Sequence, residues 1–287
     1  MKRFLSRVLP LLLSFGLIFN CTGCSTVLVL AGKARENSEA SSSVISESSA
    51  SSGVISTPVP TEDGDLRAFY TDVANAESVT VMVYMIGSDL ESEDGSATDD
   101  LLEMANAALS ENVHLVLQTG GTETWWNDVC TDDESERFVI ENGDMTLLQS
   151  LGSMNMTDAD TLSDFIRFSA ESYPADRYEL ILWDHGGGTM TGFGYDELYE
   201  DTSLTLSSLS TALYNGGVQF DFIGFDACLM ATAEVAYALD PYADYLIASE
   251  ESEPGEGWAY KNWLTMLAED PAVPTAELGK KLADDFL

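Results

Sequence analysis

Apolar positions in this chain alternate between short continuous runs and stretches at helical spacing. The continuous runs, which indicate buried strands, cover residues 79–87, 113–119, 178–184, 220–226 and 244–250. Helical spacing is seen over 97–109, 157–173, 204–215 and 229–239. Residues 137–151 are predicted as a β-hairpin around Asn142 and Gly143. This alternation predicts an α/β fold with a mostly parallel sheet that helices cover on both faces.

Two chemically capable residues follow strands of the predicted sheet. His185 comes directly after the run 178–184, and Cys228 comes after the run 220–226. In a parallel sheet both sit at the edge where ligands bind. We expect Cys228 to open the helix 229–239, where the helix dipole favours a thiolate and a neighbouring histidine can accept the proton. Alone, such a cysteine is more often a core residue and such a histidine a turn residue; their shared edge favours a nucleophile and its base.

Other chemistries are less well supplied by the sequence. The His-Gly-Gly-Gly segment at 185–188 is also typical of lipase oxyanion loops, but the G-x-S-x-G motif that this reading requires is absent from the sequence. No H-E-x-x-H zinc motif occurs, and the second histidine, His114, lies in a strand pattern. A disulfide between Cys130 and Cys228 is a further alternative.

The charge of the chain limits its partners. It has 12 Lys and Arg against 49 Asp and Glu, a formal net charge of −37. Nucleic acid and anionic membrane surfaces would be repelled, whereas a cationic substrate would be attracted. An acidic surface that keeps an exported protein soluble is the simpler explanation for most of the excess.

The N-terminus has the pattern of an export signal, because Lys2, Arg3 and Arg7 precede an apolar run. The segment "CTGC" resembles a lipoprotein box with Cys24 as the lipidated residue; a retained membrane anchor is the alternative. Residues 37–64 are rich in Ser and have no aromatic side chain. We therefore predict a signal peptide at 1–24, a flexible linker at 25–77 and a domain at 78–287 that faces outside the cytoplasm, attached to the cell membrane by lipid.

Three segments carry a resemblance to a known family. "WDHGGG", "IGFDACLMATAEVAYAL" and "ASEESEPGEGWAY" resemble the motifs of the clostripain family of cysteine peptidases, in the caspase-like clan, and the likeness runs from about Val79 onward. The resemblance implies a caspase-like three-layer α/β/α sandwich and a cysteine endopeptidase without a cofactor. His185 and Cys228 match the catalytic pair. The N–H groups of Gly186 and Cys228 would then stabilise the oxyanion.

The resemblance also implies a specificity. Asp226 matches an acidic position that the family associates with a basic side chain in the S1 pocket, which implies cleavage of peptides after Arg or Lys through an acyl-enzyme. A capping role for Asp226 is an open alternative. Glu250 and Trp258 are further candidates for substrate contact. Some relatives bind calcium, but the acidic segment 89–100 has Asp94 where an EF-hand needs Gly, which favours a solvated loop.

The alternative from another class is a catalytically inactive, surface-displayed binding lipoprotein. The chain stops within a helical pattern at 275–287, so we expect the domain to be C-terminally incomplete. Residues 186–227 contain no Lys or Arg, and an enzyme specific for these residues could not cut itself there. Arg137, in the predicted hairpin, is the expected exposed site for trimming.

Overall fold

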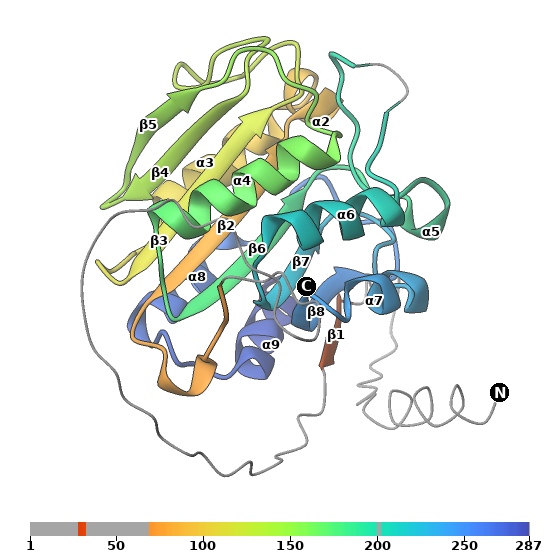
Figure 1. Ribbon diagram of the computed structural model, residues 1–287. Helices are drawn as coiled ribbons and strands as arrows, with labels where there is room; N and C mark the ends of the chain where they lie inside the picture. Colours follow the sequence, from red (N-terminus) through yellow and green to blue (C-terminus); the bar gives the residue numbers. More distant parts are fainter. Residues whose placement is uncertain (1–27, 33–68, 200–201, 287) are drawn as a thin grey trace, which may run out of the picture.

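The computed structural model describes residues 28–32, 69–199 and 202–286, which form one mixed eight-stranded sheet in the order β1-β8-β7-β6-β2-β3-β4-β5 (Figure 1). The five central strands, β8, β7, β6, β2 and β3, are parallel, whereas β1, β4 and β5 are antiparallel to their neighbours. The strands are β1 (Leu28–Gly32), β2 (Val79–Ile86), β3 (Val113–Gly120), β4 (Glu136–Glu141), β5 (Asp144–Ser150), β6 (Arg177–Trp183), β7 (Phe220–Asp226) and β8 (Ala243–Ser249).

Helices cover both faces of this sheet. One apolar cluster contains residues of α4 (Ala159–Ser172), α6 (Leu206–Gly216) and α7 (Ala233–Leu239). The other contains residues of α3 (Ser96–Ala105), α8 (Tyr260–Glu269) and α9 (Thr275–Phe286). Figure 1 shows these two sets of helices on opposite sides of the strands. The three-layer α/β/α architecture predicted from the sequence is therefore confirmed.

Strand β2 shows why continuous apolar runs became central strands. All eight of its residues are buried, and their side chains alternate between the two clusters. Met82, Tyr84 and Ile86 belong to the cluster beneath α4, while Val81 and Val83 belong to the cluster on the α3 face. A strand that is covered on both faces has no solvent-facing side, which explains the absence of a polar alternation in the sequence.

Local signals set several element ends. The side chain of Asp158 accepts a hydrogen bond from the Asp160 N–H and caps α4. Asn142 and Gly143 both have positive φ, at 53° and 86°, as a two-residue hairpin turn between β4 and β5 requires. Three short elements were not predicted: the 3-10 helix η1 (Val73–Asn75), α2 (Ser88–Ser92) and α5 (Gly188–Thr191). Helix α8 and strand β1 were also not predicted.

A buried ion cluster lies at the edge of the sheet where β6 and β7 begin. The guanidinium of Arg177 lies 2.9 Å from a carboxylate oxygen of Glu179 and 2.6 Å from one of Asp221. It also donates to the carbonyl oxygens of Pro271 and Val273, and the Thr275 hydroxyl donates to Asp221. These bonds attach the start of α9 to the sheet.

Arg137 is not an exposed site for trimming: it is 3% exposed in β4, bonded to Gln118, Gln149 and Asp164. The range predicted as a linker, 25–77, contains β1 and η1. Cys24 and the predicted signal peptide lie outside the described residues. In the part of the chain that the structure describes, no helix is long and apolar enough to cross a membrane.

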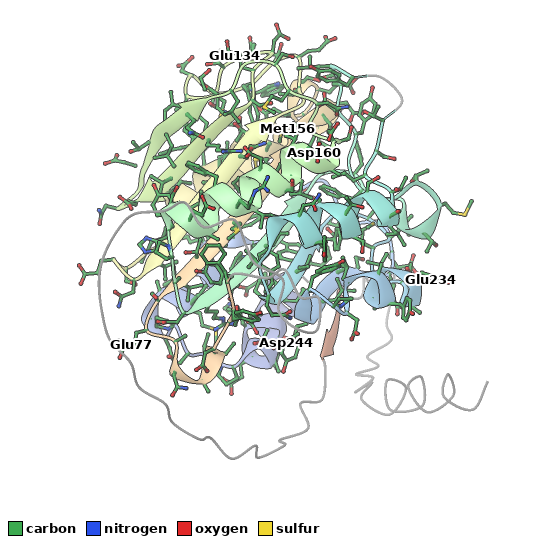
Figure 2. The ribbon with its side chains drawn as sticks, in the orientation of Figure 1. Glu77, Glu134, Met156, Asp160, Glu234 and Asp244 are labelled. Atoms are coloured by element: carbon green, nitrogen blue, oxygen red, sulfur yellow. The ribbon has the colours of Figure 1, made fainter. Side chains whose placement is uncertain are left out.

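The acidic surface is spread over the molecule. Figure 2 labels Glu77, Glu134 and Glu234 at widely separated points of the outline of the molecule, and Asp160 within that outline. Among them, Glu77, Asp160 and Glu234 are exposed. This distribution suits the solvated-surface explanation for most of the negative charge, so any recognition of a cation must rest on a local site.

Candidate active site

The two sequence motifs meet at the edge where β6 and β7 end. These strands are parallel neighbours, with Trp183 paired to Asp226, and the Asp184 N–H donates to the Asp226 carbonyl oxygen at 3.2 Å. His185 and Cys228 therefore begin adjacent loops on the same edge of the sheet, as the sequence predicts.

Glycines let the two loops pack against each other. A Cβ built on Gly186 would lie 2.0 Å from the carbonyl oxygen of Cys228, and one built on Gly188 would lie 3.0 Å from that of Leu229. No side chain fits at Gly186 unless the backbone moves. The residues after His185 are thus in direct backbone contact with the residues around Cys228.

The environment of Cys228 differs from the prediction in one respect. Helix α7 does not start at residue 229 but at Ala233, where the Thr232 side chain caps it by accepting from the Val235 N–H. Leu229 has a φ of 64°, which a helix cannot contain. Cys228 consequently lies in a loop between β7 and α7, and the prediction that a helix dipole acts on its thiol is wrong.

The thiol of Cys228 is half-buried and has one close polar neighbour. Its Sγ accepts a hydrogen bond at 3.2 Å from the backbone N–H of Glu253, which lies in the loop after β8. Cys228 and Cys130 are both free, so the disulfide alternative is not realised. Cys130 is buried, and burial raises the pKa of its thiol to about 12. Of these two cysteines, Cys228 is the accessible one.

His185 has a partner that the sequence analysis did not assign. Its Nε2 lies 2.7 Å from Oδ1 of Asp89, in α2. The imidazole is 43% exposed and the Asp89 side chain 44%, so both remain open to solvent. The ring of Tyr195 is 6.4 Å away, centroid to centroid. An open hollow of about 290 Å³ borders the imidazole and is lined by Gly186, Gly187, Thr191, Gly192, Gly194, Tyr195, Thr202 and Ser203.

The predicted oxyanion donors are Gly186 and Cys228. Neither backbone N–H donates a hydrogen bond to another described residue. The role of both amides as oxyanion donors stays a prediction.

Carboxyl groups gather behind Cys228. Asp226 is 5% exposed and accepts from the Tyr260 hydroxyl at 2.8 Å and from the Trp258 N–H at 3.2 Å. Asp100, on α3, is 4% exposed and accepts from the Trp183 indole at 2.6 Å. A Cβ built on Gly257 would lie within 3.4 Å of both carboxylates. We call Asp100, Asp226 and Glu253 the carboxylate cluster.

Burial makes ionisation of this cluster costly. It raises the pKa of Asp226 to about 6, even though the bonds from Tyr260 and Trp258 oppose the shift. Burial, followed by the negative charge of Asp226, raises the pKa of Glu253 to about 10. The pKa of Asp100 is also raised by burial and by Asp226. No Lys or Arg of the described residues forms an ion pair with the cluster.

The remaining candidates lie in different surroundings. Glu250 is exposed at the end of β8. The Trp258 ring is 1% exposed and packs against Gly224 in the core, so it does not offer a surface to substrate; its backbone N–H instead binds Asp226.

The acidic segment 89–100 is not the solvated loop that the sequence predicts, because residues 89–92 belong to α2, residues 96–100 belong to α3, and Glu91 and Asp100 are buried. Asp89 binds His185, Glu91 is buried and caps α3 by accepting from the Thr98 N–H, and Asp100 faces Trp183. Within the described ranges, no group of three or more His, Cys, Asp or Glu side chains could hold a metal ion. These residues therefore do not fit a calcium site.

Comparison with known proteins relates this arrangement to one family. The model of the clostripain family matches residues 83–287. Clostripain from Hathewaya histolytica is 29% identical over 218 residues, which cover 64% of this chain and 41% of clostripain.

Solved structures share the fold. A secreted C11 cysteine protease from Bacteroides thetaiotaomicron, in complex with an irreversible peptide inhibitor, aligns with a TM-score of 0.58 at 23% identity, covering 73% of this chain and 57% of that one. An inactive zymogen C11 protease from Parabacteroides distasonis aligns with a TM-score of 0.55 at 27% identity, covering 72% and 57%. This chain spans less than two thirds of the length of each of these relatives.

Proposed function

Because this chain belongs to the clostripain family, we propose that it is an extracytoplasmic cysteine endopeptidase that cleaves peptides after Arg or Lys. Cys228 is the nucleophile and His185 the acid and base. The observation that carries the proposal is the backbone contact between Gly186 and Cys228, which joins the two motif loops at one edge of the sheet.

The reaction follows from the chemistry of these groups. His185 takes the proton of the Cys228 thiol, and the thiolate attacks the scissile carbonyl carbon. The N–H groups of Gly186 and Cys228 donate to the oxyanion of the tetrahedral intermediate. His185 then protonates the leaving amine, and a thioester remains. Water, deprotonated by His185, attacks the thioester and releases the carboxylate product and the free thiol.

Specificity for a basic residue is supported by the carboxylate cluster. Asp226 lies two residues before the nucleophile, and the cluster has no counter-charge among the described residues. With pKa values of about 10 for Glu253 and about 6 for Asp226, Glu253 is neutral at neutral pH and Asp226 carries a buried charge without a cation, which is energetically unfavourable. A guanidinium or ammonium group of the substrate would supply the missing charge and place the next carbonyl carbon near Cys228.

Location outside the cytoplasm is supported by the N-terminal pattern of Lys2, Arg3 and Arg7 and by the secreted relative from B. thetaiotaomicron. Lipidation of Cys24 would hold the enzyme at the membrane. Incorporation of radiolabelled palmitate into the wild-type chain, and not into Cys24→Ser, is expected; equal labelling of both would contradict the lipid anchor.

Peptide cleavage by the full chain tests the activity. Fluorogenic peptides that differ only in the residue before the scissile bond are offered to wild type, Cys228→Ala and Cys130→Ala. We expect turnover of Arg and Lys peptides by wild type and Cys130→Ala, and none by Cys228→Ala. Turnover by Cys228→Ala at the wild-type rate would refute the assignment. A wild type that neither cleaves nor is labelled by an Arg-directed chloromethyl ketone would instead support the binding-lipoprotein alternative.

A further inference from the structure

The carboxylate of Asp89 contacts the imidazole of His185 from a separate element. Asp89 is the second residue of α2, the short helix after β2, and β2 is the strand beside β6 in the sheet. Its Oδ1 lies 2.7 Å from His185 Nε2. An ionised carboxylate can only accept, so the proton of a neutral His185 is held on Nε2. Nδ1 then carries the lone pair that can accept a thiol proton.

The backbone that carries Asp89 is fixed by its neighbours. Ser88 is fully buried with a φ of 49°, a conformation that non-glycine residues rarely adopt. Its N–H donates to the Gly121 carbonyl oxygen at 3.1 Å, and the Gly87 N–H donates to that of Gly120 at 2.8 Å. Strain of this kind persists where surrounding bonds over-determine it, and it is frequent at functional sites.

A buried bond links this backbone to the loop of His185. The Ser88 hydroxyl donates to Oδ1 of Asp184 at 2.7 Å, and the other carboxylate oxygen of Asp184 accepts from the Tyr195 N–H. Asp184 directly precedes His185, and its own N–H is bonded to the Asp226 carbonyl oxygen. The Ser88–Asp184 bond therefore fixes Asp89 relative to both loops of the catalytic edge.

We propose that Asp89 is a positioning residue for His185, so that the site works as an Asp89–His185–Cys228 triad supported by the Ser88–Asp184 hydrogen bond. This inference rests on the proposed function of the His185–Cys228 pair. Asp89 keeps the imidazole in one orientation and tautomer, and it stabilises the imidazolium that forms when Cys228 loses its proton. Asp89 does not itself take up the proton.

Three groups face the imidazole and would influence a pH profile. Asp89 faces it from α2, Asp184 lies next to it along the chain, and Tyr195 approaches from the following loop. Asp184 is buried, and burial raises the pKa of its carboxyl to about 7, so it titrates within the measured range in wild type and variants alike. Asp89 is thus the group whose removal changes the charge beside Nε2 without opening the core.

The test compares Asp89→Ala and Asp89→Asn with the control Asp94→Asn, an exposed carboxylate five residues further on. Two quantities are measured on the full chain: kcat and KM on an Arg peptide, and the rate of Cys228 alkylation by iodoacetamide between pH 5 and 9, followed by mass spectrometry. We expect Asp89→Ala to lower kcat between about tenfold and 10⁴-fold, the upper figure being that of a fully buried Asp–His pair. KM should change by less than about threefold, as for an interaction made in the transition state.

The alkylation profile of Asp89→Ala should move to higher pH by a few tenths of a unit to about one unit, because an exposed carboxylate stabilises the imidazolium only modestly. Asp89→Asn keeps a hydrogen-bond acceptor without the charge and should fall between Asp89→Ala and wild type. Ser88→Ala, which removes the supporting hydroxyl, should lower kcat with a smaller shift of the profile.

Two results would overturn the inference. One is an Asp89→Ala variant with wild-type kcat and an unmoved profile; the other is an equal effect of Asp94→Asn, which would show a general charge effect. Failure of the proposed function is distinguishable, because a wild type without turnover still gives an alkylation profile. If Asp89→Ala does not fold, Asp89→Asn takes its place, and an alkylation profile of Asp89→Asn that matches wild type would overturn the inference.

Discussion

Buried carboxyl groups lie at both edges of the central sheet, and the two groups differ in counter-charge. Where β6 and β7 begin, Glu179 and Asp221 surround the guanidinium of Arg177. Where β7 ends, Asp226 lies with Asp100 and Glu253, and no described cation pairs with them. An ion cluster that contains its own cation can serve structure alone. A carboxylate group without one costs free energy, and binding a cationic ligand would recover that cost.

The largest expected effect comes from removing the cation at the edge where β6 and β7 begin, which we call the paired edge. Arg177→Met leaves Glu179 and Asp221 buried without a cation and removes the bonds to Pro271 and Val273. We expect a loss of about 3 to 5 kcal/mol in the free energy of unfolding, measured by urea denaturation. Lys261→Met, at an exposed cation, is the control and should stay within about 0.5 kcal/mol. Equal stability of the two variants would show that the positive charge of Arg177 does not offset the buried carboxylates of Glu179 and Asp221.

The second effect is a dependence of stability on pH, which is expected at both edges. The folded pKa of Asp226, about 6, lies above its ordinary value of 3.8, so the folded state binds more protons than the unfolded state between these values. Stability from this group is therefore present below about pH 4 and is lost as pH rises to 6. Glu179, with a pKa raised by burial to about 8 from 4.5, loses stability over a higher window.

Unfolding free energies measured from pH 4 to 8 should follow these windows. Asp226→Asn should reduce the loss of unfolding free energy between pH 4 and 6 by about 1 to 3 kcal/mol. Glu179→Gln should reduce the loss toward pH 8 by a similar amount. A decline between pH 4 and 6 that persists unchanged in Asp226→Asn would mean that this carboxyl is not the destabilising group.

The smallest effect compares two hydroxyl donors. Thr275 donates to Asp221 at the paired edge, and Tyr260 donates to Asp226 at the catalytic edge. Thr275→Val and Tyr260→Phe should each cost about 1 kcal/mol of stability. Only Tyr260→Phe should also lower kcat/KM for Arg peptides. A loss of activity in Thr275→Val at equal folded fraction would mean that the edges are not functionally distinct.

Most of the fold was predictable because continuous apolar runs and helical spacing are read from neighbouring residues. The ends of the central strands match the prediction to within one residue, and the hairpin turn at Asn142 and Gly143 has the expected geometry. Helix α2 was missed because five residues carry no period. The start of α7 was wrong because the apolar spacing continues through Leu229, whose φ of 64° the pattern cannot reveal; Thr232 was the available capping signal.

The candidate site was predictable only where a residue follows its strand directly. His185 and Cys228 could be assigned to one edge on that ground. Asp89 was not identified, because its contact depends on the strand order β7-β6-β2, in which β2 lies beside β6 although 90 or more residues separate them. Asp100 and Glu253 join Asp226 from α3 and from the loop after β8, a meeting that no periodicity encodes. Arg137 was misjudged because the sheet face it occupies is covered by Phe168 and Asp164 of α4.

In the proposed function, the carboxylate cluster receives the basic side chain of the substrate. This recognition is tested most directly by kcat/KM for two peptides that differ only in Arg or its neutral analogue citrulline before the scissile bond. We predict a strong preference for Arg in wild type and in the control Asp99→Asn, at an exposed carboxylate on α3. In Asp226→Asn the preference for Arg over citrulline should fall by about 2 to 5 kcal/mol, which is roughly 30-fold or more. The variant should still cleave the citrulline peptide slowly, and it should remain folded. An Asp226→Asn enzyme that still prefers Arg to the wild-type extent would show that the cluster does not bind the basic side chain.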